Sequence, residues 1–275
     1  MEELTMHPIK MYILDNGWVE YDESLLVSNP TLDTISNHNP YRKWIKSPCY
    51  CVLIDHPEKG WMLFDTGSHP EAMKGYWPNE TIKQFPYYRT EQQLLINQLA
   101  LIGLKPQDIK TVILSHGHLD HAGGLFLFKN ADIYWPKADY EYAKRLLAIQ
   151  PESRSSGPYI RADIESPARE LHFVTKNLKL APGIEIITLR GHTPEVLGLV
   201  VHLNSCTYIF PSDGIYMAPN YGSRINQSDI FYDNLSCLES IEKVRKLNEK
   251  SHSRIMYSHD MEQFKRFKLA PEYYE

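Results

Sequence analysis

Three histidines and one aspartate fall within six residues of this chain, and this cluster restricts the possible folds more than any other feature. The stretch reads Ser115-His-Gly-His-Leu-Asp-His-Ala-Gly-Gly124, and it directly follows the short apolar run Thr111-Val-Ile-Leu114. Such a run predicts a buried strand. On a helix the three imidazoles would spread around the axis, whereas a loop at the end of a buried strand can turn them toward one point. The sequence therefore predicts a metal-binding loop, with a polar loop of hydrogen-bonded histidines as the alternative.

Three more candidate ligands lie far away in the sequence, and each follows a predicted apolar strand. They are His192, Asp213 and His259. If these strand ends meet at one edge of the sheet, the full candidate set is His116, His118, Asp120, His121, His192, Asp213 and His259. Seven nitrogen and oxygen ligands exceed the four of one tetrahedral Zn²⁺, so we expect two metal ions that share a carboxylate. Imidazole and carboxylate without thiolate suit Zn²⁺, with Fe, Mn or Co as substitutes.

Composition fits an ordinary globular protein and excludes several classes. The 275 residues are 43% hydrophobic and 23% charged, which excludes a disordered or fibrous chain. No Gly/Ser-rich or Pro-rich linker and no internal repeat divides the sequence, so we expect a single domain over residues 1–275. The net charge of −5, without a Lys/Arg-rich stripe, argues against nucleic acid as a partner.

The cysteines and the first residues bear on the cellular compartment. Four cysteines are too few for a disulfide scaffold, and we interpret the neighbouring Cys49 and Cys51 as reduced core thiols. The chain begins with acidic residues, and no apolar run approaches the ~18 residues of a membrane span. We therefore expect a cytoplasmic protein without a membrane partner.

Apolar periodicity predicts an α/β protein with sheets inside and helices outside. Strands are expected over 49–55, 61–65, 111–114, 184–189, 197–203 and 207–211. Helices are expected from the capping box Thr90-x-x-Gln93 to Gly103, and near 138–149 and 234–249.

The ligand pattern resembles the signature of the metallo-β-lactamase superfamily. The matching residues are His116-x-His118-x-Asp120-His121, the later His192, Asp213 and His259, and the earlier Asp65-Thr66-Gly67. This resemblance implies an αββα sandwich with a dinuclear metal site at one edge of its two sheets. It also implies that one metal is held by His116, His118 and His192, the other by Asp120, His121 and His259, and that Asp213 bridges them.

Within that superfamily the chain is similar to the N-acyl homoserine lactonases, the quorum-quenching branch. The similarity lies in Ser212-Asp-Gly-Ile-Tyr216, in His259-Asp-x-Glu-Gln263 with Pro271-Glu-Tyr273, and in residues 65–71 and 156–160. It implies a dinuclear zinc hydrolase that opens the lactone ring of N-acyl homoserine lactones by attack of a metal-bridging hydroxide. A small acyl lactone is the expected substrate; the oligomeric state stays open, a homodimer included.

The resemblance also implies roles for individual side chains. Tyr216 donates its phenol to the developing oxyanion, the alternative being a core aromatic, and Asp120 additionally delivers a proton to the alkoxide leaving group. Asp65 either orients a ligand histidine or caps a strand end. Leu119 and nearby aromatic residues either line an acyl-chain pocket or pack in the core; the aromatic residues are Tyr76, Trp77, Phe85, Tyr87 and Tyr88. We interpret the remaining histidines as surface or hydrogen-bonded groups, namely His7, His38, His56, His172, His202 and His252. His69 is a weaker candidate for the site.

One position departs from the lactonase pattern. Many lactonases have Gly-His-x-x-Gly, whereas this chain reads Gly191-His-Thr-Pro-Glu195, so a carboxylate replaces a glycine beside a ligand. The alternatives on the same scaffold are hydrolases of thioesters, other lactones, β-lactams or phosphodiesters. A non-catalytic metal-binding or redox module is the alternative from another class, although flavo-diiron proteins replace a histidine of the motif with an acid.

Overall fold

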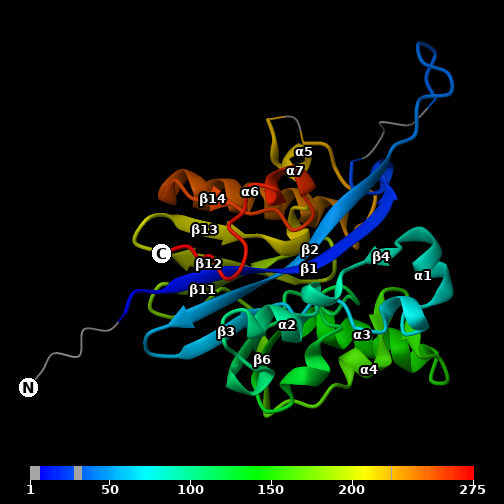
Figure 1. The fold of residues 1–275 in the computed structure, drawn as a ribbon. Helices are drawn as coiled ribbons and strands as arrows, with labels where there is room; N and C mark the ends of the chain where they lie inside the picture. The colour runs from blue at the N-terminus through cyan, green and yellow to red at the C-terminus, as the bar shows by residue number, and fades with distance from the viewer. Residues whose placement is uncertain (1–6, 28–32, 224) are drawn as a thin grey trace, which may run out of the picture.

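Two β-sheets lie face to face in the protein, which we describe from a computed structural model covering residues 7–27, 33–223 and 225–275 (Figure 1). The first sheet has the strand order β4-β1-β2-β3-β5-β6-β9 and the second has the order β10-β11-β12-β13-β14. The first-sheet strands are β1 (Lys10–Asp22), β2 (Trp44–His56), β3 (Gly60–Phe64), β4 (Tyr87–Tyr88), β5 (Thr111–Ile113), β6 (Asp132–Pro136) and β9 (Glu170–Val174). The second-sheet strands are β10 (Leu178–Ala181), β11 (Ile184–Leu189), β12 (Val196–His202), β13 (Thr207–Phe210) and β14 (Arg254–Ile255). A separate hairpin joins β7 (Ser155–Ser156) to β8 (Tyr159–Ile160).

Helices cover the outer faces of both sheets. Figure 1 shows α6 on one side of the sandwich and α2, α3 and α4 on the other. The α-helices are α1 (Asn79–Gln84), α2 (Leu95–Ala100), α3 (Lys137–Ile149), α4 (Arg161–Ile164), α5 (Ala218–Tyr221), α6 (Asn234–Ser251) and α7 (Met261–Phe264).

Alternating side chains of the strands hold the layers together. On β1, Met11 and Ile13 pack in the core between the sheets, while Tyr12 and Leu14 pack in the core under α2 and α3. Successive side chains of a strand point to opposite faces of the sheet, so one strand that is buried on both faces contributes to both cores.

The second sheet follows the same rule. Ile184 and Ile186 of β11 face the first sheet, whereas Ile187 and Leu189 pack against Ile241 of α6. The result is a four-layer arrangement of helices, sheet, sheet and helix, which confirms the αββα sandwich that the resemblance implied.

β1, which is as long as β2, was not predicted from the sequence. Within β1 the residues Asp15-Asn16-Gly17 read as a turn, but they form a bulge where the pairing with β2 shifts register, and Gly17 has φ +90°. The predicted helix between Thr90 and Gly103 is shorter than expected. The capping box is present, but it opens a 3₁₀ turn over Glu91–Gln93, and the extended backbone of Leu94 separates this turn from α2.

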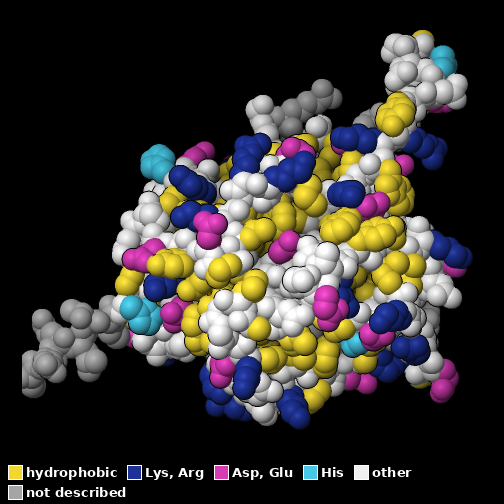
Figure 2. Space-filling model, viewed as in Figure 1, with side chains coloured by type: hydrophobic (Ala, Val, Ile, Leu, Met, Phe, Trp, Pro, Cys, Tyr) yellow, Lys and Arg dark blue, Asp and Glu magenta, His cyan; other side chains and the backbone are white. Residues whose placement is uncertain are grey.

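Other expectations concern the surface and the thiols. All four cysteines are free, and Cys49 and Cys51 are buried. Within the described ranges, every helix is too short or too polar to cross a membrane. Acidic and basic side chains are interspersed on the face seen in Figure 2.

Candidate metal centre

The loop after β5 folds tightly enough to point its polar side chains in one direction. The backbone N–H groups of His121 and Ala122 both donate to the carbonyl oxygen of His118, at 3.0 and 2.8 Å. The two glycines that follow allow close approach of other backbone. A Cβ atom would lie 2.3 Å from the His69 nitrogen at Gly123, and 2.4 Å from the Thr66 oxygen at Gly124. These glycines are therefore required by packing.

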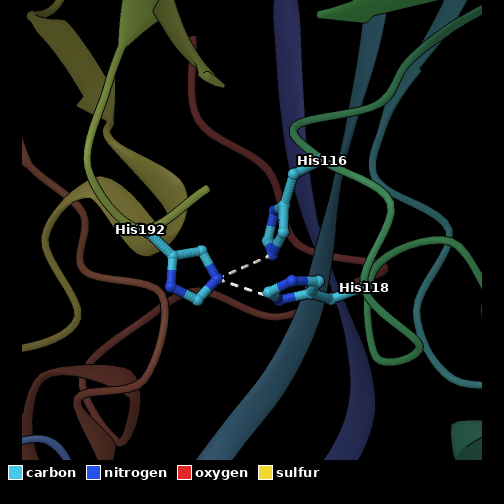
Figure 3. A group of neighbouring side chains, drawn as sticks. All are labelled: His116, His118 and His192. Atoms are coloured by element: carbon cyan, nitrogen blue, oxygen red, sulfur yellow. Dashed lines mark hydrogen bonds between the residues drawn. The ribbon is translucent and has the colours of Figure 1, made fainter. Parts of the chain in front are cut away.

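Three imidazoles form the first cluster. The Nε2 atom of His192 lies 3.1 Å from Nε2 of His116 and 2.9 Å from Nδ1 of His118, and all three rings turn a nitrogen toward one point (Figure 3). Ligands of one tetrahedral Zn²⁺ lie about 3.3 Å apart when each Zn–N bond is 2.0–2.1 Å. The separations therefore fit a metal-binding triad.

The second cluster consists of Asp120, His121 and His259. The Nε2 atoms of His121 and His259 lie 3.7 and 3.8 Å from Oδ2 of Asp120. Both histidines are buried, and Asp120 is partly exposed. This group combines a strand-end loop of the first sheet with a residue that follows β14 of the second sheet.

Asp213 lies between the two clusters. Its Oδ1 is 3.3 Å from Nε2 of His121 and 3.2 Å from Nε2 of His259. Its Oδ2 is 3.5 Å from Nε2 of His192 and 3.9 Å from Nε2 of His116. One carboxylate oxygen thus faces each cluster, as a bridging ligand requires.

The chemistry of these donors fits metal ions. The buried Nε2 of His121 and Oδ1 of Asp213 have no hydrogen-bond partner, which is costly unless another group binds them. Burial, reinforced by neighbouring imidazoles, holds the pKa values of His116 and His118 well below the usual range. Both rings are therefore neutral at pH 7 and keep a lone pair available for a cation.

Asp65 contacts both a candidate ligand and the start of the loop that carries it. Its Oδ2 lies 2.8 Å from Nδ1 of His121, so it orients a candidate ligand. Its two oxygens also accept hydrogen bonds from the backbone N–H and hydroxyl of Ser115, at 2.7 and 2.8 Å, which fastens the start of the loop. Asp65 has φ +60°, an uncommon backbone conformation that these contacts stabilise.

The hydroxyl of Tyr216 lies against a candidate ligand. It is 2.5 Å from Nδ1 of His192 and donates to the carbonyl oxygen of Ile230 at 2.9 Å. The phenol is therefore buried beside the first cluster, contacts His192 and lines the adjacent cavity.

A cavity of about 400 Å³ opens beside the two clusters. One end is polar and includes His118, Asp120, His192, Asp213 and His259. The other end is apolar and is lined by Val19, Tyr21, Leu25, Leu26, Trp77, Phe85, Leu119 and Ile230. The lining therefore combines polar groups with apolar side chains, as suits a molecule that has a polar and an apolar part.

Some expected cavity residues lie elsewhere. Trp77, Phe85 and Leu119 line the cavity, but Tyr76 binds Asp163, Tyr87 binds the carbonyl of Asn16, and Tyr88 is exposed. Five apolar residues that line the cavity were not predicted from the sequence: Val19, Tyr21, Leu25, Leu26 and Ile230. These apolar residues come from β1, the turn after it and the segment before α6, and nothing in their local sequence separates them from ordinary core.

The other histidines lie outside the two clusters. His69 stacks on Tyr76 with ring centroids 3.6 Å apart, and His56 is buried against the carbonyl oxygen of Pro182. His172 lies near Asp132 and Glu170 at the outer edge of the first sheet, where Arg169 already pairs with Asp132.

Glu195 does not line the cavity. Its carboxylate is buried and lies 3.9 Å from the Arg190 guanidinium, and burial raises its pKa. The unusual residue of the His192 loop thus belongs to the packing behind the loop.

A histidine- and aspartate-rich strand-end loop at the edge of an αββα sandwich defines a metal-dependent hydrolase. The family model described as the Metallo-beta-lactamase superfamily matches residues 44–250. The chain is 31% identical over 265 residues to the N-acyl homoserine lactonase AiiB of Agrobacterium fabrum, covering 93% of this chain and 95% of that protein. The AiiB lactonase of Rhizobium rhizogenes matches with the same identity and the same coverage. The chain therefore belongs to the metallo-β-lactamase superfamily and, within it, to the N-acyl homoserine lactonase family.

Solved structures agree with this assignment at the level of the fold. An N-acyl homoserine lactone hydrolase with N-hexanoyl-L-homoserine at its catalytic metal centre superposes with a TM-score of 0.80, at 24% identity, over 98% of this chain and all of that chain. AidC, a dizinc quorum-quenching lactonase, gives a TM-score of 0.68 at 20% identity, over 94% of this chain and 90% of that chain.

Proposed function

We propose that this protein is a dinuclear zinc hydrolase that opens the lactone ring of N-acyl homoserine lactones. The observation that carries the proposal is the position of Asp213, which turns one oxygen to each of two metal-ligating clusters at the polar end of an apolar cavity. The relatives named as lactonases of these substrates support the same reaction.

Seven side chains would hold the metals. His116, His118 and His192 would bind one ion, Asp120, His121 and His259 the other, and Asp213 both; Fe, Mn or Co could replace Zn²⁺. Two such ions, when bound, supply an acidified water as nucleophile and a Lewis acid for the lactone carbonyl.

The chain's own groups then handle the developing charge and the proton. The phenol of Tyr216 is a donor for the carbonyl oxygen as it becomes negative, once it releases the carbonyl of Ile230. Asp120 is more exposed than the other candidate carboxylate, Asp213, and faces the cavity. It can therefore take the proton that the attacking water gives up and pass it to the alkoxide that leaves when the ring opens. That alkoxide stays attached to the product, because the substrate is cyclic.

The apolar end of the cavity would hold the acyl chain. Leu25, Leu26 and Ile230 line it together with Trp77 and Phe85. Burial of a chain there contributes about 0.8 kcal/mol per methylene group, which favours an acylated lactone over a bare one.

A substrate panel tests the proposal. Metal-replete protein is assayed on N-acyl homoserine lactones, simple lactones, thioesters, β-lactams and phosphodiesters. We expect the acyl homoserine lactones to have the highest kcat/KM. Higher kcat/KM on any other class would replace the lactonase with that alternative hydrolase, and no turnover with two metals bound would favour a binding module.

Two coarser points belong to the same proposal. We propose that residues 1–275 act as one domain, because both sheets supply residues to the same clusters, and that the protein works in the cytoplasm on a small molecule. Limited proteolysis and cell fractionation test these points.

A further inference from the structure

A buried carboxylate lies directly behind the first histidine cluster, outside the cavity. Asp139, in the first turn of α3, is fully buried. Its Oδ2 accepts the backbone N–H of Gly117 at 2.7 Å and the indole N–H of Trp135 at 3.0 Å. Its Oδ1 accepts the hydroxyl of Tyr159 at 2.6 Å. Gly117 is the residue between the candidate ligands His116 and His118.

The side chains around Asp139 also pack closely against the loop that carries Gly117. A Cβ atom on Gly117 would lie 2.9 Å from both Ile164 and Trp135, and 3.3 Å from Oδ2 of Asp139. Tyr159, which Asp139 holds, contacts the ring of His118 edge-on, with centroids 4.8 Å apart. Asp139 is therefore connected to the loop through the backbone at Gly117 and through the ring behind His118.

Asp139 does not serve its own helix. An aspartate at the start of a helix commonly caps the first backbone N–H groups. Here α3 has no side-chain cap, and Asp139 instead accepts hydrogen bonds from Gly117, Trp135 and Tyr159. Burial of a charged carboxylate is costly unless it is hydrogen-bonded. Burial raises the pKa of Asp139 to about 6, although its hydrogen-bond donors oppose this rise.

We propose that Asp139 is a positioning residue for the metal site formed by His116, His118 and His192. It holds the Gly117 backbone and the Tyr159 ring so that His116 and His118 keep their nitrogens aimed at the point that His192 faces. This inference rests on the metal centre proposed above. It extends that proposal by naming a residue that touches neither metal nor substrate.

The test is metal affinity, measured without substrate. Asp139→Ala is titrated with Zn²⁺ against a chromophoric chelator, and with Co²⁺ while the visible spectrum of each site is followed. We expect the affinity of one of the two sites to fall about 10- to 100-fold, the range for groups that orient metal ligands. The second site should change little, because His121 is anchored separately by Asp65.

A matched control separates positioning from simple loss of a buried acid. Asp163 of α4 is also buried and also accepts a tyrosine hydroxyl, that of Tyr76, but it is not bonded to the loop of residues 115–124. Asp163→Ala should leave both metal affinities within about threefold of the unaltered protein. Asp139→Asn should restore affinity, because its amide oxygen can still accept from Gly117 and Trp135.

The outcomes are distinguishable. If the unaltered protein binds fewer than two metals, the proposed metal centre fails. If it binds two and Asp139→Ala binds both with unaltered affinity, only the positioning role is overturned. Equal losses in Asp139→Ala and Asp163→Ala would also overturn it. If Asp139→Ala does not fold, Gly117→Ala is titrated instead, because its methyl group would push the loop away from Trp135, Ile164 and Asp139. Unchanged metal affinity in that variant would overturn the proposal.

Discussion

Asp213 lies between the two candidate metal-binding clusters, with one carboxylate oxygen facing each of them. The unaltered protein should carry about two metal ions per chain, and Asp213→Ala should lose at least one of them together with its hydrolytic activity. The reason is that both ions would lose a charged ligand at once. Elemental analysis and a lactone assay measure the two quantities. A variant that keeps two metals and its rate would show that Asp213 does not bridge.

Tyr216 illustrates how one hydroxyl can serve two partners. Tyr216→Phe, assayed with excess metal, should lower kcat about 10–10³-fold, as expected for removal of one oxyanion donor. KM should change less, because that bond forms mainly in the transition state. If Tyr216→Phe has the rate of the unaltered protein once metal is in excess, the phenol acts only through its contact with Nδ1 of His192.

At the scale of elements, α4 is tied to the segment before α1 by the bond between Asp163 and Tyr76. Burial raises the pKa of Asp163 from its ordinary 3.8 to about 7, with Tyr76 opposing. Between those pH values the folded protein holds a proton that the unfolded chain has released. The free energy of unfolding therefore falls as pH rises from about 4 to 7 through this group.

This pH dependence of the free energy of unfolding leads to a prediction for Asp163→Asn. The amide can still accept from Tyr76 but never ionises, so the variant should melt at a higher temperature than the unaltered protein at pH 8. The difference should vanish near pH 4. Thermal melts of chelator-treated proteins across this range measure it, which avoids metal release in acid. If the stability of Asp163→Asn relative to the unaltered protein is lower at pH 8 than at pH 4, the raised pKa of Asp163 is contradicted.

Helices and strands whose apolar residues recur with one clear spacing could be predicted from the sequence. The strands at 184–189 and 207–211 and the helices near 138–149 and 234–249 occur within one or two residues of their predicted bounds. β1 could not be predicted, because Asp15-Asn16-Gly17 has the composition of a turn, and only pairing with β2 makes it a bulge.

The same limit applies to the candidate site. Its ligands could be found because four of them lie within one motif and the other three follow apolar strands. Asp139 could not, because a single aspartate in a predicted helix is unremarkable in sequence. Its role depends on Gly117, which lies 22 residues away and is reached only through the packing of α3 on the loop.

At the scale of the molecule, the candidate metal centre draws its ligands from both sheets. One loop of the first sheet supplies His116, His118, Asp120 and His121, whereas His192, Asp213 and His259 follow strands of the second. Chelation should therefore lower the melting temperature, on the order of 10 °C for tightly bound metal, because ions that bind only the folded state stabilise it. Differential scanning calorimetry before and after Zn²⁺ return measures this. An unchanged melting temperature would place the metals outside the sheet junction.

The division of the ligands between the sheets also has a consequence for biosynthesis. During translation the first four ligands emerge long before His259, and until β14 has paired with β13 the last one has no fixed position. A growing chain can offer only incomplete sites to a passing ion. In the proposed metal centre, loading with two ions would therefore be a late event that follows the pairing of β14 with β13.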